Sequence, residues 1–307
     1  MKISRLLVAV VCLSLVAGAA FADNASGGLR YSITVAKFEN KAGWSGQWDL
    51  GDAWGTVLTD LLTQTNRFIV LGEKDMRAEA LNEQDFAASG RTAGGKKAPA
   101  TGQMTPAQLL VKGAITHVQD NTAGGGGGIA IHGIRVGGGG GKGEVNATIY
   151  IVDSSTGQVL ASKSVVGVSN KKALSLGYSG AGFSGDVAGF KNDNVGKAVE
   201  SACGEAVKFM IEQLPKIPWS GTVVQVASGK VYINRGTREG VTSGQQFIIG
   251  NAEIIRDPDS GEVLDTNVTE IARIEVTEVK EKLSIAKITK GNATSVRKGM
   301  EVSALMK

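Results

Sequence analysis

The sequence predicts an α/β (α+β) domain with a mixed sheet, followed by a small all-β domain. Strand-like and helix-like patterns alternate as far as Leu214, the order typical of an α/β layer. Pro215 and Pro218 then end the last helix, because proline cannot continue it. From Gly221 onward, short alternating strands are separated by Gly and Asn turns. The predicted segments are a signal peptide at 1–22, the α/β domain at 23–214 and a β-barrel or sandwich at 215–307.

The first 22 residues have the pattern of a secretory signal peptide. Lys2 and Arg5 precede an apolar run over 6–20, and small residues then lead to a cleavage site between Ala22 and Asp23. The run of about 15 residues is shorter than the roughly 20 needed to cross a bilayer. The mature protein is therefore expected outside the cytoplasm.

Cysteine placement bears on both anchoring and crosslinking. Cys12 lies in the middle of the apolar run and not at its end, so no lipid anchor is expected. Once the signal is removed, Cys203 is the sole cysteine, and an intramolecular disulfide cannot form. Its position on the apolar face of a helix at 194–214 favours a buried core residue over a reactive thiol.

The first elements of the α/β domain follow from alternation and capping residues. The segment 31–38 alternates as a strand, and a loop follows with Trp44 and Trp48. Asp49 or Asp52 is then placed to cap a helix. The apolar positions of that helix recur at helical spacing: Leu50, Ala53, Trp54, Val57, Leu58, Leu61 and Leu62. A buried strand at 67–71 and a helix at 73–88 come next.

The remaining elements of this domain carry clear turn signals. The segment 91–102 is a loop, and Thr105-Pro106 is predicted to open a third helix before a strand at 110–119. Strands at 145–152 and 159–168 are expected to form a hairpin through the turn Asp153-Ser-Ser-Thr-Gly157.

The β domain is predicted from five alternating runs. They lie at 223–226, 231–234, 246–249, 271–279 and 284–289. Its turn at Asp257 repeats the D-x-x-[S/T]-G-x-V-L pattern of Asp153, which indicates shared turn chemistry. Calcium binding by these aspartates and Asp259 is the alternative, but the oxygen-ligand spacing of an EF-hand loop is missing.

No catalytic constellation is found, so the chain is not expected to be an enzyme. Gly141-Lys142 fails the phosphate-binding loop pattern, because Val136 and Gly143 occupy the required glycine and hydroxyl positions. The sequences around Ser179 and Ser184 lack the final glycine of a nucleophile elbow. His117 and His132 are the only histidines, and with one mature cysteine they give no zinc set. We expect no catalytic, cofactor or metal site.

Several motifs, in order, carry a family likeness. They are VAKFENK from Val35, LTDLLTQTNRFIV from Leu58, LNEQ from Leu81, LLVKGAIT from Leu109 and IVDSSTGQVL from Ile151. Together they resemble the CsgG family of curli secretion components over roughly 29–214. Residues 221–223, 231–236, 239–241 and 255–264 are similar to the C-terminal domain of flagellar assembly protein T.

The resemblance implies a CsgG-like, TolB-N-like three-layer domain with extended β-hairpins. Such domains assemble into rings in the periplasm, and two hairpins per subunit join an outer-membrane barrel that exports unfolded curli subunits. The hairpins would fall at 116–150 and 160–190. The loop before the first helix, with Trp44, Gln47 and Trp48, would lie at the ring centre.

The glycine-rich hairpin has two interpretations. The candidate membrane-facing residues are Ile129, Ile131, Ile134, Val136, Tyr178 and Phe183. Glycine runs flank the first four and specify strand register poorly, which favours a surface hairpin, whereas the family layout favours membrane insertion.

The expected function is curli-type secretion or assembly of surface polymers by a homo-oligomeric ring. The alternative is a soluble periplasmic scaffold associated with a flagellar or other envelope ring, without pore activity. The expected location is the periplasm, with outer-membrane contact and without a lipid anchor. Partners would be other copies of the chain and secreted or envelope proteins. The formal net charge of +4 over 307 residues gives no nucleic-acid signature.

Overall fold

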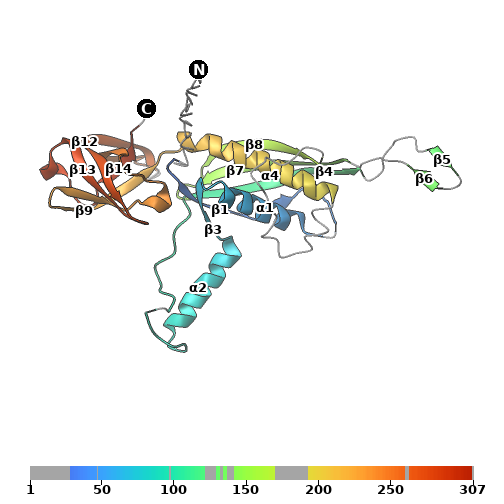
Figure 1. Cartoon of the computed structure of the whole chain (residues 1–307), viewed down its shortest axis with the longest axis horizontal. Coiled ribbons are helices and arrows are strands. Elements are labelled where there is room, and N and C mark those ends of the chain that lie inside the picture. Colours follow the sequence, from blue (N-terminus) through green and yellow to red (C-terminus); the bar gives the residue numbers. More distant parts are fainter. Residues whose placement is uncertain are drawn as a thin grey trace, which may run out of the picture.

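The computed structural model describes residues 28–46, 48–96, 98–121, 129–131, 134–136, 142–169, 193–259 and 263–305. Figure 1 shows a sheet with two helices along it and, beside this sheet, a separate barrel formed by the later part of the chain. The signal peptide and its cleavage site at Ala22 and Asp23 lie outside the described residues. Among the described helices, none is both long and apolar enough to span a lipid bilayer.

The sheet is mixed, as the alternating pattern predicts. Its strand order is β3-β1-β4-β7-β8, and the short β2 pairs with β4. β1 is parallel to both β3 and β4, while β4, β7 and β8 form an antiparallel meander. The strands are β1 (Tyr31–Val35), β2 (Glu39–Asn40), β3 (Phe68–Leu71), β4 (Leu109–Asn121), β7 (Lys142–Asp153) and β8 (Val159–Val168).

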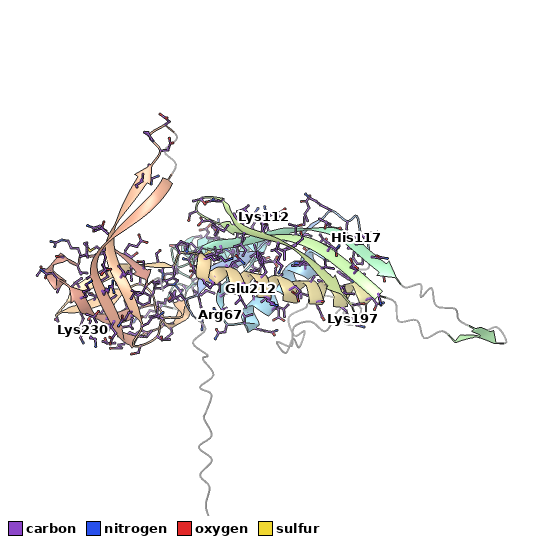
Figure 2. The ribbon with its side chains drawn as sticks, turned by 90° about the horizontal axis from the view of Figure 1, so that it is seen from above. Arg67, Lys112, His117, Lys197, Glu212 and Lys230 are labelled. Carbon is purple, nitrogen blue, oxygen red and sulfur yellow. The ribbon has the colours of Figure 1, made fainter. Side chains whose placement is uncertain are left out.

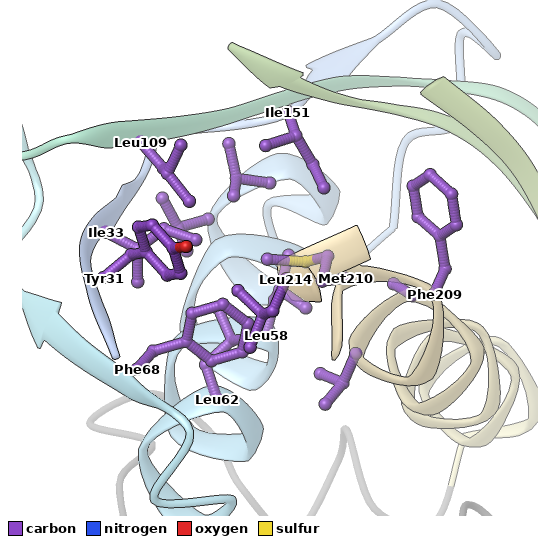
Figure 3. Packing of buried hydrophobic residues seen from close by; sticks show 14 of the residues in the cluster. Tyr31, Ile33, Leu58, Leu62, Phe68, Leu109, Ile151, Phe209, Met210 and Leu214 are labelled. Atoms are coloured by element: carbon purple, nitrogen blue, oxygen red, sulfur yellow. The ribbon is translucent and has the colours of Figure 1, made fainter. Parts of the chain in front are cut away.

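Helices α1 (Leu50–Gln64) and α4 (Asn194–Gln213) cover the sheet and contact each other. Each begins at an aspartate cap: the Asp49 carboxylate accepts a hydrogen bond from the Asp52 amide at 2.8 Å, and Asp193 accepts one from Val195 at 3.2 Å. Their apolar faces close a core around Ile33, shown in Figure 3.

Cys203 lies in this core, as predicted. Its side chain is fully buried on α4, and burial raises the pKa of the thiol well above its usual value. Since the thiolate is the reactive form, the burial that stabilises the core also keeps this sulfur unreactive at neutral pH.

Helix α2 (Lys74–Ala88) has no buried residue and extends away from the sheet in Figure 1. Met76, Leu81 and Phe86 are among its exposed side chains. The third layer of the expected three-layer arrangement stays a prediction.

The prediction of a helix that begins at Thr105-Pro106 is wrong. The segment before β4 is not helical, because Gln108 is hydrogen-bonded to Ser32 of β1. The Gln108 amide donates to the Ser32 carbonyl at 2.9 Å, and the Gln108 side-chain oxygen accepts from the Ser32 amide at 3.0 Å. With only two residues between Pro106 and Leu109, one helical turn could not form without breaking these bonds.

The turn between β7 and β8 confirms its sequence signature. The Asp153 carboxylate accepts from the amides of Ser155 and Thr156 at 2.7 and 2.9 Å, and Gly157 has φ of 74°. An aspartate at this position satisfies two amides, and glycine adopts positive φ without strain. At the second copy of the pattern, Asp257 accepts from the Asp259 amide at 2.8 Å.

Six strands after Pro218 form a closed barrel in the order β10-β13-β12-β11-β14-β9. Figure 2 shows β11 and β12 continuing beyond the barrel as a paired arm. Both strands extend beyond the alternating runs at 246–249 and 271–279 that predict them. The sequence pattern does not predict the short β14. The strands are β9 (Ser220–Ala227), β10 (Lys230–Ile233), β11 (Gln246–Arg256), β12 (Val263–Val279), β13 (Ser284–Gly291) and β14 (Glu301–Ala304).

The barrel contacts the N-terminal part of the sheet through the short 3-10 helix η2 (Thr237–Glu239). The Arg30 amide donates to the Glu239 carbonyl at 2.9 Å, and the Arg238 guanidinium donates to the Thr105 hydroxyl at 3.2 Å. The Tyr31 hydroxyl donates to the Ile217 carbonyl, and burial raises the pKa of this phenol to about 12. Two further 3-10 helices are η1 (Leu214–Lys216) and η3 (Ala293–Ser295).

Candidate functional site

The loop between β2 and α1 has ends that are held together by charge. Lys37 lies just before β2, and its ammonium lies 3.1 Å from Asp49 and 2.8 Å from Asp52 at the start of α1. Hydrogen bonds to Asp52 and Asp49 raise the pKa of Lys37. The amide of Asp52 lowers the pKa of the Asp49 carboxyl, because it donates to the charged form. All three side chains are about half exposed, so this contact orders the loop ends more than it stabilises the fold.

Two tryptophans of this loop lie together. The Trp44 and Trp48 ring centroids are 4.6 Å apart, with the rings tilted by 47°. Both side chains are half-buried and contact the edge of the hydrophobic core. The Asn40 amide side chain donates to the Trp44 carbonyl at 2.7 Å, which fixes the backbone between them. Gln47, the third predicted loop residue, lies outside the described residues.

Gly46 allows the loop to fold over the Trp44 indole. A Cβ at this position would lie 2.1 Å from the indole Cη2, far inside contact distance. The Lys41 amide also donates to the Ile115 carbonyl of β4 at 2.9 Å. The loop is therefore anchored to the sheet on one side and to α1 on the other, and it presents a tilted indole pair at the surface.

Sequence reasoning missed one residue near this loop. Glu73, just before α2, lies against Gly55 of α1, where a Cβ would be 3.2 Å from the Glu73 carboxylate. Burial, and then the neighbouring charges of Asp52 and Asp75, raise the pKa of Glu73. The sequence feature that could have indicated this contact is Gly55. Glycine is unfavourable in the middle of a helix, so its presence there suggests that a neighbouring group approaches closely.

Glu73→Gln is expected to stabilise the protein at pH 7. The pKa of Glu73 is raised in the folded state, so folding disfavours its carboxylate, and stability falls as pH rises from below the unfolded pKa through the folded one. Glutamine removes this penalty. Urea unfolding should therefore show a higher midpoint for the variant at pH 7 and no difference near pH 3.5. The control is Glu79→Gln on the exposed part of α2; a pH-independent effect at Glu73 would contradict the assignment.

The predicted hairpin residues are only partly described. Ile129 and Ile131 lie in β5 (Ile129–Ile131), and Ile134 and Val136 lie in β6 (Ile134–Val136). The two strands are antiparallel, with Ile129 opposite Val136 and Ile131 opposite Ile134. Tyr178 and Phe183 lie outside the described residues. Figure 1 shows β5 and β6, which hold the four described positions, apart from helix α1.

A comparison with models of protein families identifies the family of this chain. The model of the curli production assembly/transport component CsgG matches residues 21–245. The chain belongs to the CsgG family. The matched CsgG segment extends past α4 into the barrel, further than the motifs at 29–214 had indicated. The likeness of the C-terminal part to flagellar assembly protein T stays a prediction. None of the curated proteins matches the chain.

Solved structures similar to this CsgG-family chain have low sequence identity. The PelC dodecamer from Paraburkholderia phytofirmans is 12% identical, with a TM-score of 0.31, covering 58% of this chain and 86% of that one. The hypothetical protein CT253 from Chlamydia trachomatis is 11% identical, with a TM-score of 0.35 and coverages of 59% and 96%. Lipoprotein GNA1162 from Neisseria meningitidis is 16% identical, with a TM-score of 0.25 and coverages of 61% and 99%. At these scores the assignment depends on the family match.

Proposed function

We propose that this CsgG-family chain is a cell-envelope protein that serves curli-type secretion or assembly of surface polymers as a homo-oligomeric ring. The family match supports the envelope role. The predicted signal peptide supports a periplasmic location, in contact with the outer membrane. In this proposal, the tryptophan loop contacts the polymer as it passes or binds.

The indole pair of Trp44 and Trp48 carries the proposal. Tryptophan offers a large apolar surface at a low entropic cost, because only two side-chain torsions are fixed on binding. The ion pairs of Lys37 and the Asn40 hydrogen bond order the loop before any partner arrives. A loop ordered in advance loses less entropy on contact, so it suits repeated contact with an extended chain.

Trp48→Ala is expected to reduce export of an epitope-tagged curli-type subunit by about tenfold, which corresponds to a loss of about 1.4 kcal/mol of contact free energy, a modest value for a tryptophan at the centre of an interface. The variant would be expressed in a strain lacking its own copy of the gene, and the tagged subunit reaching the cell exterior would be quantified. The side chain is half-buried at the edge of the core, so the thermal unfolding midpoint and the native mass should stay close to those of the wild type.

Phe86→Ala provides the matched control, because it removes an exposed aromatic ring from α2, away from the loop. Export should be unchanged in this variant. Normal export with Trp48→Ala would contradict the role of the loop and would favour the scaffold function without pore activity. Loss of export in both variants would show that the effect is not specific to the loop.

A further inference from the structure

Two adjoining cavities lie on the surface of the barrel. The first has a volume of about 560 Å³ and is lined by polar groups that include Ser220, Thr222 and Asn251. The second, of about 590 Å³, is lined by Gln225 and by valine side chains. Arg297 and Lys298 line both cavities, and the two cavities with these shared, exposed cations are here called the groove. Both are open hollows on the surface of the barrel.

The backbone that carries these two cations is fixed. Gly299 donates to the Val223 carbonyl at 2.8 Å, and Val223 donates to the Met300 carbonyl at 2.9 Å. The Met300 amide closes the turn onto the Arg297 carbonyl at 3.3 Å. Gly299 has φ of 92°, a conformation that other residues rarely adopt. The turn 297–300 is therefore attached to β9 by two hydrogen bonds and holds Arg297 and Lys298 in place.

These two cations differ from most others on the barrel in having no carboxylate partner. Lys287 pairs with Glu275 at 2.9 Å, and Arg273 pairs with Glu270 at 2.8 Å. In the part of the chain that the structure describes, neither groove cation has a carboxylate within ion-pair distance. Glu301 also lines the first cavity and opposes an anionic ligand there. The local charge is thus positive at the middle of the groove and reduced at one end.

We propose that this groove binds an acidic glycan, a strand of sugars that bears carboxylates. The carboxylates would pair with Arg297 and Lys298, the guanidinium offering a planar fork that matches the carboxylate geometry. Sugar hydroxyls would bond to Ser220, Thr222 and Asn251 in the first cavity and to Gln225 in the second. The valines beside Gln225 offer an apolar surface for a sugar ring face. Two joined cavities suit more than one sugar unit.

The groove is tested with the full-length protein and a fluorescently labelled oligogalacturonate, by anisotropy at low salt. Arg297→Gln and Lys298→Gln should each weaken binding by about fivefold, the upper range for an exposed ion pair. Glu301→Gln should strengthen binding, because it removes the one carboxylate that lines the groove. Lys230→Gln is the matched control: this exposed lysine on β10, labelled in Figure 2, lines neither cavity, and its loss should leave the affinity unchanged.

Three results would overturn the proposal. The first is an equal loss of affinity with Lys230→Gln, which would mean general charge attraction. The second is equal binding of a neutral oligoglucan, or of inorganic polyphosphate, which would remove the requirement for sugar or for carboxylate respectively. The third is no measurable binding of oligogalacturonate by the wild type. None of these results depends on export, so the test is independent of the proposed secretion role.

Discussion

Trp54→Ala should lower the free energy of unfolding by about 3–5 kcal/mol, the range for removing a large aromatic side chain from a core. The Trp54 side chain is fully buried on α1 and stacks on Phe38 with ring centroids 5.3 Å apart. Its carbonyl also faces the Cys203 thiol of α4 at 3.9 Å. The truncation would leave a cavity between the sheet and its two helices. Urea unfolding followed by circular dichroism would measure the change.

Trp48→Ala is the control for this variant. It removes the same side chain six positions earlier, where the ring is only half-buried, and should cost no more than about 1 kcal/mol. Similar losses in the two variants would contradict the distinction between a structural tryptophan in the core and surface tryptophans in the loop. Trp54→Phe, which retains an aromatic ring, should recover part of the stability if the stacking on Phe38 is correct.

Gly167→Ala should destabilise the protein by about 3 kcal/mol, because it forces backbone segments apart. A Cβ at Gly167 of β8 would lie 1.9 Å from the Ala198 carbonyl oxygen and 2.6 Å from the Ala202 amide of α4. These are backbone atoms of a helix and cannot rotate away as a flexible side chain can. The long helix would have to shift on the sheet, and the thermal unfolding midpoint should fall by about 6–12 °C if the α/β domain unfolds as one unit of about 200 residues.

Gly94→Ala is the control for the glycine variant. Nothing lies within 4 Å of a Cβ built there, and the position does not have positive φ, so the unfolding midpoint should not fall. If Gly167→Ala were equally harmless, α4 could not lie as close to β8 as the structure places it. That result would contradict the close contact between helix α4 and strand β8.

The elements that the sequence predicts well are those with local causes. The Asp153 turn depends on residues within four positions, and α4 depends on apolar spacing along one helix, so both are readable from the pattern. The error at Thr105-Pro106 has a distant cause. Ser32, more than seventy residues earlier, binds Gln108 and keeps the segment from forming a helix. Strand β14 was missed because four residues are too short for a clear alternation and are ordered by β9 and β11.

The same distinction between local and distant causes applies to the residues of the candidate site. The tryptophans and the capping aspartate were identifiable from the sequence, since their residue types and spacing are distinctive. The bridge from Lys37 to Asp49 and Asp52 was not predicted, because it depends on how the loop returns to the sheet. Glu73 was missed for a similar reason: its environment is created by Gly55 on another helix. The groove at Arg297 depends on barrel closure and on the lack of a carboxylate partner among the described residues, and no local pattern encodes either.

The hydrogen bond from Tyr31 to the Ile217 carbonyl joins residues 186 positions apart, and this has a consequence for the order of folding. Strand β1 has neighbours in β3 and β4, but its tyrosine is not satisfied until the segment after α4 has emerged. Contacts of such long range form slowly, because the intervening chain must lose its freedom first. A chain delivered N-terminus first would leave the Tyr31 hydroxyl without this partner, and the core without α4, during that interval. Its folding yield should then depend on protection from aggregation during synthesis and delivery.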